Sequence, residues 1–124
     1  MTQPVLEATH LTRTFGDFVA VDDATFTLQP GEIVGFLGPN GAGKTTTIKM
    51  LTGLLGPSTG AARVAGYDIV AQPLEAKAHI GYVPDTPNLY GKLKAGEYLR
   101  FVGQLYKVPP AQVEERMRPM LDMF

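Results

Sequence analysis

Residues 38–45 have the spacing of a phosphate-binding loop, G-x-x-x-x-G-K-[ST]. Glycine has no Cβ, so such a loop can curl around a phosphate and turn consecutive backbone N–H groups inward. The lysine supplies a positive charge for the β- and γ-phosphates, and the final hydroxyl is suited to ligating Mg²⁺. The eight residues are Gly38, Pro39, Asn40, Gly41, Ala42, Gly43, Lys44 and Thr45.

The segments on either side of this loop fit the same role. The apolar run at 32–37 predicts a buried strand leading into the loop, and 46–52 predicts a helix. The N-terminus of that helix would favour a bound anion through its dipole. The alternative is an accidental glycine-rich turn, and such a match is expected by chance in well under ~1% of chains this short. The motif in this setting predicts that the protein binds a nucleotide phosphate.

The remaining elements must position this loop. Residues 5–15 and 20–29 predict strands, the second half-buried and antiparallel because Ala24, Phe26 and Leu28 alternate with threonines. The loop helix is expected over 44–54, ended by Gly53 and by Gly56-Pro57. Further along the chain we expect strands at 61–70 and 80–83 and a helix near 73–79.

The last thirty residues predict two helices, separated by Pro109-Pro110. Pro119 is expected to kink the second helix or to end it early. Each helix has an apolar stripe, for which core packing is the expected role. The stripes are Ala95, Leu99, Val102 and Tyr106 on the first, and Val113, Met117, Met120, Leu121 and Phe124 on the second.

Composition excludes several classes of function. The 124 residues fit one domain. With a formal net charge of −1 and no Lys/Arg run, the sequence lacks the concentrated positive charge that binds nucleic acid or an acidic membrane surface. The absence of cysteine excludes disulfides, thiolate metal sites and a cysteine nucleophile. We find no secretory signal and no apolar run near the ~18 residues that span a bilayer. We therefore expect no direct membrane insertion, and any membrane role would come through a partner.

Several motifs, in this order, resemble the ATP-binding domain of ABC transporters. Residues 38–46 have the sequence G-P-N-G-A-G-K-T-T, which is the form of this motif in the family and adds Thr46 to the candidate phosphate site. Phe15-Gly16 followed by Ala20-Val21 resembles the loop in which an aromatic ring stacks on adenine. Residues 57–60 and 64–68 resemble the turn and strand that follow the loop helix. The resemblance covers nearly the whole chain.

The resemblance implies an α/β fold with a P-loop NTPase core. An N-terminal antiparallel β subdomain and that core would occupy 1–93, and the start of a helical subdomain would occupy 94–124. The expected cofactors are ATP and Mg²⁺, with Phe15 on the base and Thr45 as a metal ligand. The expected partners are a transmembrane permease subunit and a second ATP-binding domain in a dimer. The expected location is cytoplasmic, peripheral to the inner (plasma) membrane.

Residues 80–85 occupy the segment that in the family ends in a glutamine, and here Asp85 stands in its place. Aspartate is shorter and charged, and its carboxylate is a hard oxygen ligand for Mg²⁺. Asp85 is therefore a second candidate metal ligand, with a plain turn residue before Pro87 as the alternative. The sequence from Asp85 to Tyr90 resembles a bacterial exporter branch of the family, of the ABC-2 type.

The motifs of the family's second half are absent from these 124 residues. There is no Ser-Gly-Gly signature, no apolar strand ending in Asp-Glu (Walker B) and no histidine in the switch position. Neither His10 nor His79 matches that switch. We therefore name no catalytic residue and interpret the domain as truncated before the signature and Walker B motifs. We expect this chain alone to bind nucleotide at most and to be marginally stable.

Two other functions remain open. The chain could belong to a non-hydrolysing, truncated or degenerate module that binds a nucleotide or a partner domain. It could also be another P-loop enzyme, such as a small kinase or a GTPase. The scattered arginines do not suit a kinase lid, however, and a guanine-reading Asn-Lys-x-Asp motif is absent.

Overall fold

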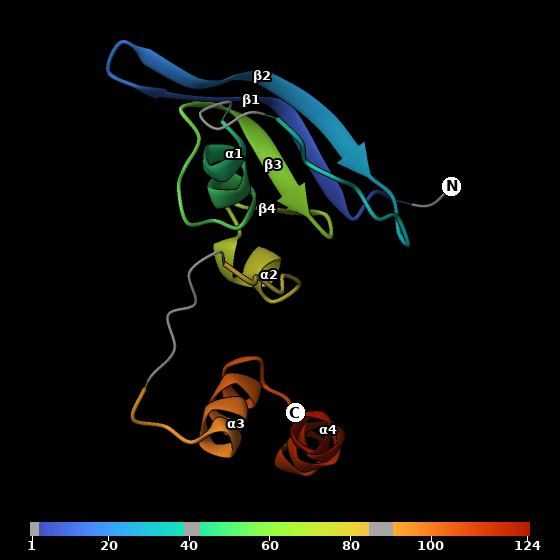
Figure 1. Ribbon diagram of the computed structural model, residues 1–124. Helices are drawn as coiled ribbons and strands as arrows, with labels where there is room; N and C mark the ends of the chain where they lie inside the picture. Colours follow the sequence, from blue (N-terminus) through green and yellow to red (C-terminus); the bar gives the residue numbers. More distant parts are fainter. Residues whose placement is uncertain (1–2, 39–42, 85–90) are drawn as a thin grey trace. The chain divides into compact units, whose positions relative to one another are not determined.

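The computed structural model describes residues 3–38, 43–84 and 91–124 of the chain (Figure 1). Contacts divide the chain into two units, Met1–Tyr82 and Val83–Phe124, which are described separately below. The functional division between 1–93 and 94–124 stays a prediction. Pro39, Asn40, Gly41, Ala42 and Asp85 lie outside the described residues.

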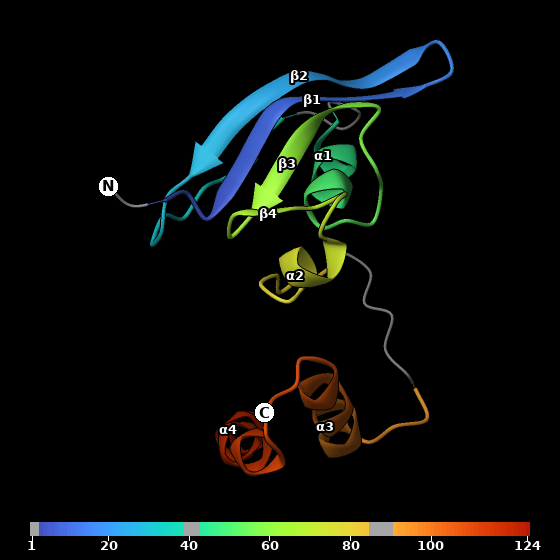
Figure 2. The same cartoon turned by 180° about the vertical axis from the view of Figure 1, so that it is seen from behind.

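The first unit is built on an antiparallel sheet in the order β2-β1-β3-β4 (Figures 1 and 2). Its strands are β1 (Leu6–Phe15), β2 (Phe18–Leu28), β3 (Thr59–Val64) and β4 (Tyr67–Asp68). β1 and β2 form a hairpin, and inner and outer residues of β2 alternate after Asp23 as the sequence predicts. The N-terminal antiparallel subdomain is therefore confirmed.

The prediction of a single strand at 61–70 is wrong. β3 and β4 form a hairpin instead, and they are joined by Ala65-Gly66 with φ of 53° and 84°. Two consecutive residues with positive φ make the tight turn that matches the natural twist of a hairpin. The turn residues, rather than the apolar pattern around them, decide the structure here.

The core of this unit lies between the sheet and two helices. Helix α1 (Lys44–Leu51) packs against β2 and β3, and α2 (Pro73–Lys77) packs against β3 and β4 (Figure 2). α1 ends as predicted, with Gly53 in the left-handed conformation at φ 79°. The buried apolar residues are Ala8, Leu11, Val21, Met50, Leu51, Ala62, Val64, Ile69 and Ala76.

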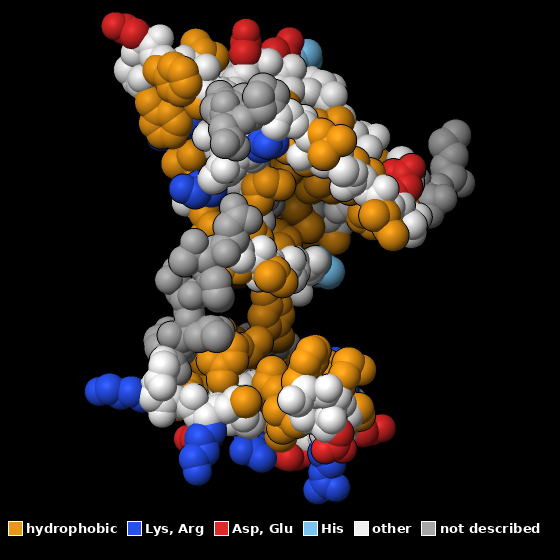
Figure 3. All heavy atoms as spheres, viewed as in Figure 1, with side chains coloured by type: hydrophobic (Ala, Val, Ile, Leu, Met, Phe, Trp, Pro, Cys, Tyr) orange, Lys and Arg blue, Asp and Glu red, His pale blue; other side chains and the backbone are white. Residues whose placement is uncertain are grey.

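The strands expected at 32–37 and 80–83 are not formed. Both segments lack regular structure, and Ile33, Leu37 and Val83 are 100%, 94% and 92% exposed. A strand exists only when its backbone groups pair with a neighbour, and no parallel neighbour is present among the described residues. Figure 3 shows the hydrophobic side chains that remain on the surface.

The second unit is a pair of helices, α3 (Ala95–Leu105) and α4 (Pro110–Met123). The two helices contact one another, and Met117 on α4 is only 4% exposed, but no residue of α3 is buried, so the core packing expected of the α3 stripe is not formed. α4 continues through Pro119 to Met123, so of the two effects expected of Pro119, a kink or an early end, the early end does not occur. The outer ends of the stripes are not core: Tyr106, Leu121 and Phe124 are 50%, 41% and 100% exposed.

Candidate nucleotide-binding site

The phosphate loop leads into α1 through Gly43, which is the N-cap of that helix. Gly43 has φ 86°, a left-handed conformation that residues with a Cβ rarely adopt. Its carbonyl oxygen accepts two hydrogen bonds from Thr47, from the backbone N–H at 2.9 Å and from the hydroxyl at 2.8 Å. Thr47 is 2% exposed, so the start of the helix is anchored inside the unit.

Gly43 also lies directly against β2. A Cβ at this position would be 2.4 Å from the carbonyl oxygen of Ala20 and 3.2 Å from Cγ2 of Val21. Only glycine leaves room for this approach. The contact joins the end of the phosphate loop to the second strand of the β1–β2 hairpin. It gives Ala20-Val21, which the sequence singled out only by resemblance, a structural role.

Lys44 extends back over the beginning of the loop. Its ammonium Nζ donates a hydrogen bond to the carbonyl oxygen of Gly38, so the first and last parts of the motif lie together. Thr45 is exposed and Thr46 is half-buried in the first turn of α1. Lys44 and Thr45 therefore stand in the first turn of α1, at the end of a helix where an anion is favoured.

Phe15 lies at the tip of the β1–β2 hairpin. It pairs with Phe18 across the turn Gly16-Asp17, and the two rings are 46% and 62% exposed. Ala20 follows Phe18 by two residues, or about 7 Å along a strand. The hairpin tip is thus joined through β2 to the residues that contact Gly43.

The sequence reasoning missed one residue at this tip. The guanidinium of Arg13 lies over the ring of Phe15, with Cζ 4.8 Å from the ring centroid. Its Nη1 also donates a hydrogen bond of 2.7 Å to the carbonyl oxygen of Gly56. The signal was present in the sequence, because residues i and i+2 of a strand project from the same face.

The structure describes one of the two candidate metal ligands, Thr45. Thr45 is exposed at the start of α1, and a hydroxyl oxygen is a kind of ligand that Mg²⁺ accepts. Asp85 lies outside the described residues. In the ranges that the structure describes, no group of three or more histidine, cysteine, aspartate or glutamate residues could hold a metal ion.

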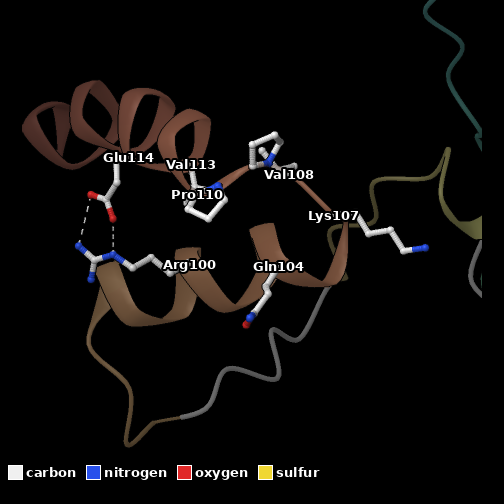
Figure 4. A pocket seen from close by; sticks show the side chains of 8 residues that line it. Arg100, Gln104, Lys107, Val108, Pro110, Val113 and Glu114 are labelled. Carbon is white, nitrogen blue, oxygen red and sulfur yellow. Dashed lines mark hydrogen bonds and ion pairs between the residues drawn. The ribbon is translucent and has the colours of Figure 1, made fainter.

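A cavity of about 410 Å³ lies between α3 and α4 (Figure 4). Arg100 and Glu114 point toward one another there, with Nε and Oε1 2.5 Å apart and Nη2 and Oε2 3.4 Å apart. The hydrogen bond from Arg100 lowers the pKa of the Glu114 carboxyl, and the same bond raises the pKa of Arg100. The sequence analysis did not foresee this pair.

A sequence model described as ABC transporter matches residues 21–123 of the chain. This chain belongs to the ABC transporter family. It is 36% identical to a solved ATP-binding subunit of an ABC transporter, with a TM-score of 0.89 over 95% of this chain and 49% of that one. The predicted family, an ABC-type ATP-binding domain, is therefore confirmed.

Curated relatives support the same family assignment. The chain is 43% identical over 122 residues to the Escherichia coli (strain K12) protein named Probable multidrug ABC transporter ATP-binding protein YbhF. It is 37% identical over 118 residues to Nod factor export ATP-binding protein I of Cupriavidus metallidurans. The predicted resemblance to bacterial exporter-type proteins is thus confirmed.

The matched region is only part of these relatives. It covers 98% of this chain but 21% of the Escherichia coli protein, and 95% of this chain but 39% of the Cupriavidus protein. In the described parts of the chain, no helix has both the length and the apolar character needed to cross a membrane.

Proposed function

We propose that this chain forms the nucleotide-binding part of an ABC transporter ATPase, which couples MgATP binding and hydrolysis to transport across a membrane. The observation that carries the proposal is the start of α1. Gly43 sits against β2, and Lys44 folds back to Gly38, so a helix N-terminus and a cation face the same place. Such an arrangement binds a polyphosphate through N–H groups and charge.

Each candidate residue has a separate role in this proposal. Lys44 and the backbone N–H groups of residues 38–46 bind the phosphates, and Phe15 stacks on the adenine. Thr45 binds Mg²⁺, with Asp85 as a second ligand that is direct or acts through water. Mg²⁺ keeps several waters and binds few protein oxygens beside the phosphates, which fits this small donor set. When bound, the ion would offset charge on the phosphate oxygens.

Hydrolysis and transport are proposed for the whole protein. Two such domains would enclose two MgATP, and a permease partner would carry the transported molecule across the inner membrane from the cytoplasmic side. The export and multidrug functions in the relatives' names support export as the direction. Residues 1–124 contain no match to the signature, the Asp-Glu strand or the switch histidine. We therefore propose that these residues by themselves bind nucleotide without turnover.

The first test is MgATP binding measured by calorimetry, with Lys44→Ala as the variant. Loss of a charge-assisted contact corresponds to ~1.5–3 kcal/mol, so affinity should fall about 10- to 100-fold. Lys49→Ala is the matched control, because Lys49 is exposed and lies in the last turn of the same helix. Equal affinities for the wild type and Lys44→Ala would contradict the proposed phosphate site.

The role of Asp85 has its own test. Asp85→Ala should weaken nucleotide binding in the presence of Mg²⁺ and leave binding in the presence of a chelator nearly unchanged, because a carboxylate acts there through the ion. Titrations with and without Mg²⁺ separate the two effects. Equal losses in both conditions would contradict a metal-linked role and leave Asp85 as a turn residue.

A further inference from the structure

We propose that Arg13 is a positioning residue for the nucleotide base, and that it acts by holding the Phe15 ring. This inference rests on the proposed function, because it assumes that Phe15 stacks on the base. It extends that function to a residue for which neither the motifs nor the family match supplies a role. The observations concern only the first unit and the described residues around the hairpin tip.

The first observation is the contact between the two side chains. Arg13 and Phe15 are separated by one residue on β1, and the guanidinium Cζ lies 4.8 Å from the ring centroid. A cation at this distance is attracted to the negative face of an aromatic ring. One face of the ring is thereby occupied, while Phe15 remains 46% exposed for another stacking partner.

The second observation is that the guanidinium is itself held in place. Its Nη1 donates to the carbonyl oxygen of Gly56, 43 residues away in the segment that follows α1. Beside it, the backbone N–H of Thr14 donates to the hydroxyl of Ser58 at 3.0 Å, and the N–H of Ser58 donates to the carbonyl of Thr12 at 2.8 Å. These hydrogen bonds thus connect β1 to the segment that follows α1.

The third observation is a buried donor. The Nε of Arg13 is inaccessible to solvent and has no hydrogen-bond partner among the described residues. Buried polar atoms without a partner are uncommon in native proteins, and each one calls for an explanation. Here the guanidinium is placed by its contacts with the ring and with Gly56, and its Nε donor is left without a partner. A solvated arginine would avoid this cost but would not fix the ring.

These contacts lead to a specific arrangement of the bound nucleotide. The guanidinium lies on one face of Phe15 and the base on another exposed part of the ring, so that the ring is already ordered before the base arrives. Ordering a side chain in advance removes part of the entropic cost of binding. Stacking of this kind tolerates different bases, because every base has a π-face. Arg13 should therefore raise affinity for ATP and GTP alike.

The test compares MgATP, MgGTP and magnesium tripolyphosphate binding to the intact protein by calorimetry. Tripolyphosphate has the phosphates without the base. Arg13→Met keeps an unbranched apolar side chain and removes the charge, and it should weaken both nucleotides about two- to fivefold, as for an exposed cation–π pair. Tripolyphosphate affinity should not change. Arg63→Met, an exposed arginine on β3, is the matched control.

A double-mutant cycle with Phe15→Leu distinguishes positioning from a merely structural role. If Arg13 acts through the ring, Arg13→Met has no further effect on nucleotide affinity once Phe15 is leucine. Arg13→Lys, which keeps the charge, should restore part of the wild-type nucleotide affinity. If Arg13→Met fails to fold, Arg13→Gln replaces it, since Gln also lacks the charge but retains an N–H donor for Gly56.

Three results would overturn the inference, and they are distinguishable. A loss of tripolyphosphate affinity equal to that of ATP would show that Arg13 only supports the fold. An unchanged effect of Arg13→Met in the Phe15→Leu background would show that it does not act through the ring. If the wild-type protein binds tripolyphosphate as tightly as ATP, the base makes no contribution and only the proposed base site is refuted. If it binds neither ligand, the proposed function itself is refuted.

Discussion

The two ends of the candidate nucleotide site are built in different ways. At the phosphate end, Gly43 and Thr47 are neighbours in sequence, and Thr47 is 2% exposed. At the base end, Arg13 and Phe15 are joined to Gly56 from a distant segment, and Phe15 is 46% exposed. The phosphate end is therefore built from backbone groups in close contact, whereas the base end is assembled from side chains and remains open. Substitutions should have larger effects at the phosphate end.

The largest effect is expected for Gly43→Ala. The new Cβ would meet the carbonyl of Ala20 at 2.4 Å, and the left-handed backbone at φ 86° adds strain of its own. Strain of ~1–2 kcal/mol and displacement of the loop together should weaken phosphate binding on the order of 100-fold. Calorimetry with MgATP and thermal unfolding measure the two parts.

Gly66→Ala is the matched control for that experiment. Gly66 has nearly the same φ, 84°, but a Cβ at this position would have no other atom within 4 Å and would point into open space. The Gly66→Ala variant should lose stability from backbone strain alone and keep its nucleotide affinity. Equal loss of binding in both variants would show that the close approach to β2 is unimportant, and the proposed difference between the two ends would disappear.

A smaller effect is expected for Phe15→Leu at the base end. Leucine keeps apolar contact but loses the planar ring, and stacking on a base is worth ~1–3 kcal/mol. Affinity for MgATP should fall about tenfold, while affinity for magnesium tripolyphosphate stays the same. Phe18→Leu is a matched comparison, because Phe18 is the more exposed ring of the same turn. A larger loss from Phe18→Leu would assign the base to that ring instead.

The smallest effect is expected outside both ends, for Glu114→Gln in the α3–α4 pair. The pKa of Glu114 is lowered in the folded state, chiefly by the hydrogen bond from Arg100, so the pair stabilises the protein above the ordinary pKa of a carboxyl. This contribution is lost as the pH falls through the lowered folded-state pKa. Both side chains are about half exposed, so solvent and salt weaken the pair.

Thermal unfolding as a function of pH tests this expectation. At neutral pH, Glu114→Gln should unfold at a slightly lower temperature than the wild type. This difference in unfolding temperature should vanish in acid and shrink in high salt. Glu115→Gln, at an exposed neighbour, is the control for charge alone. A difference that persists in acid would contradict an origin in the ion pair.

The predictions from sequence succeeded where the signal is local. The helix after the phosphate loop, the stop at Gly53 and the alternation in β2 follow from neighbouring residues, and all three are confirmed. The predictions of strands at 32–37 and 80–83 are wrong, because an apolar run becomes a strand only when a neighbouring strand pairs with it. The hairpin of β3 and β4 was missed because two turn residues interrupt an otherwise suitable pattern.

Sequence alone thus determined the family and predicted the chemistry of the phosphate end, because spacing within one loop is enough to place N–H groups, a cation and a hydroxyl together in the chain. Only the tertiary structure decided that Gly43 lies on Ala20 and that Arg13 holds Phe15 while bonded to Gly56. The contacts of Gly43 with Ala20 and of Arg13 with Gly56 join residues far apart in the chain, and no local pattern encodes them. They depend on how the hairpin packs beside the helix, where packing rather than propensity determines which side chains meet.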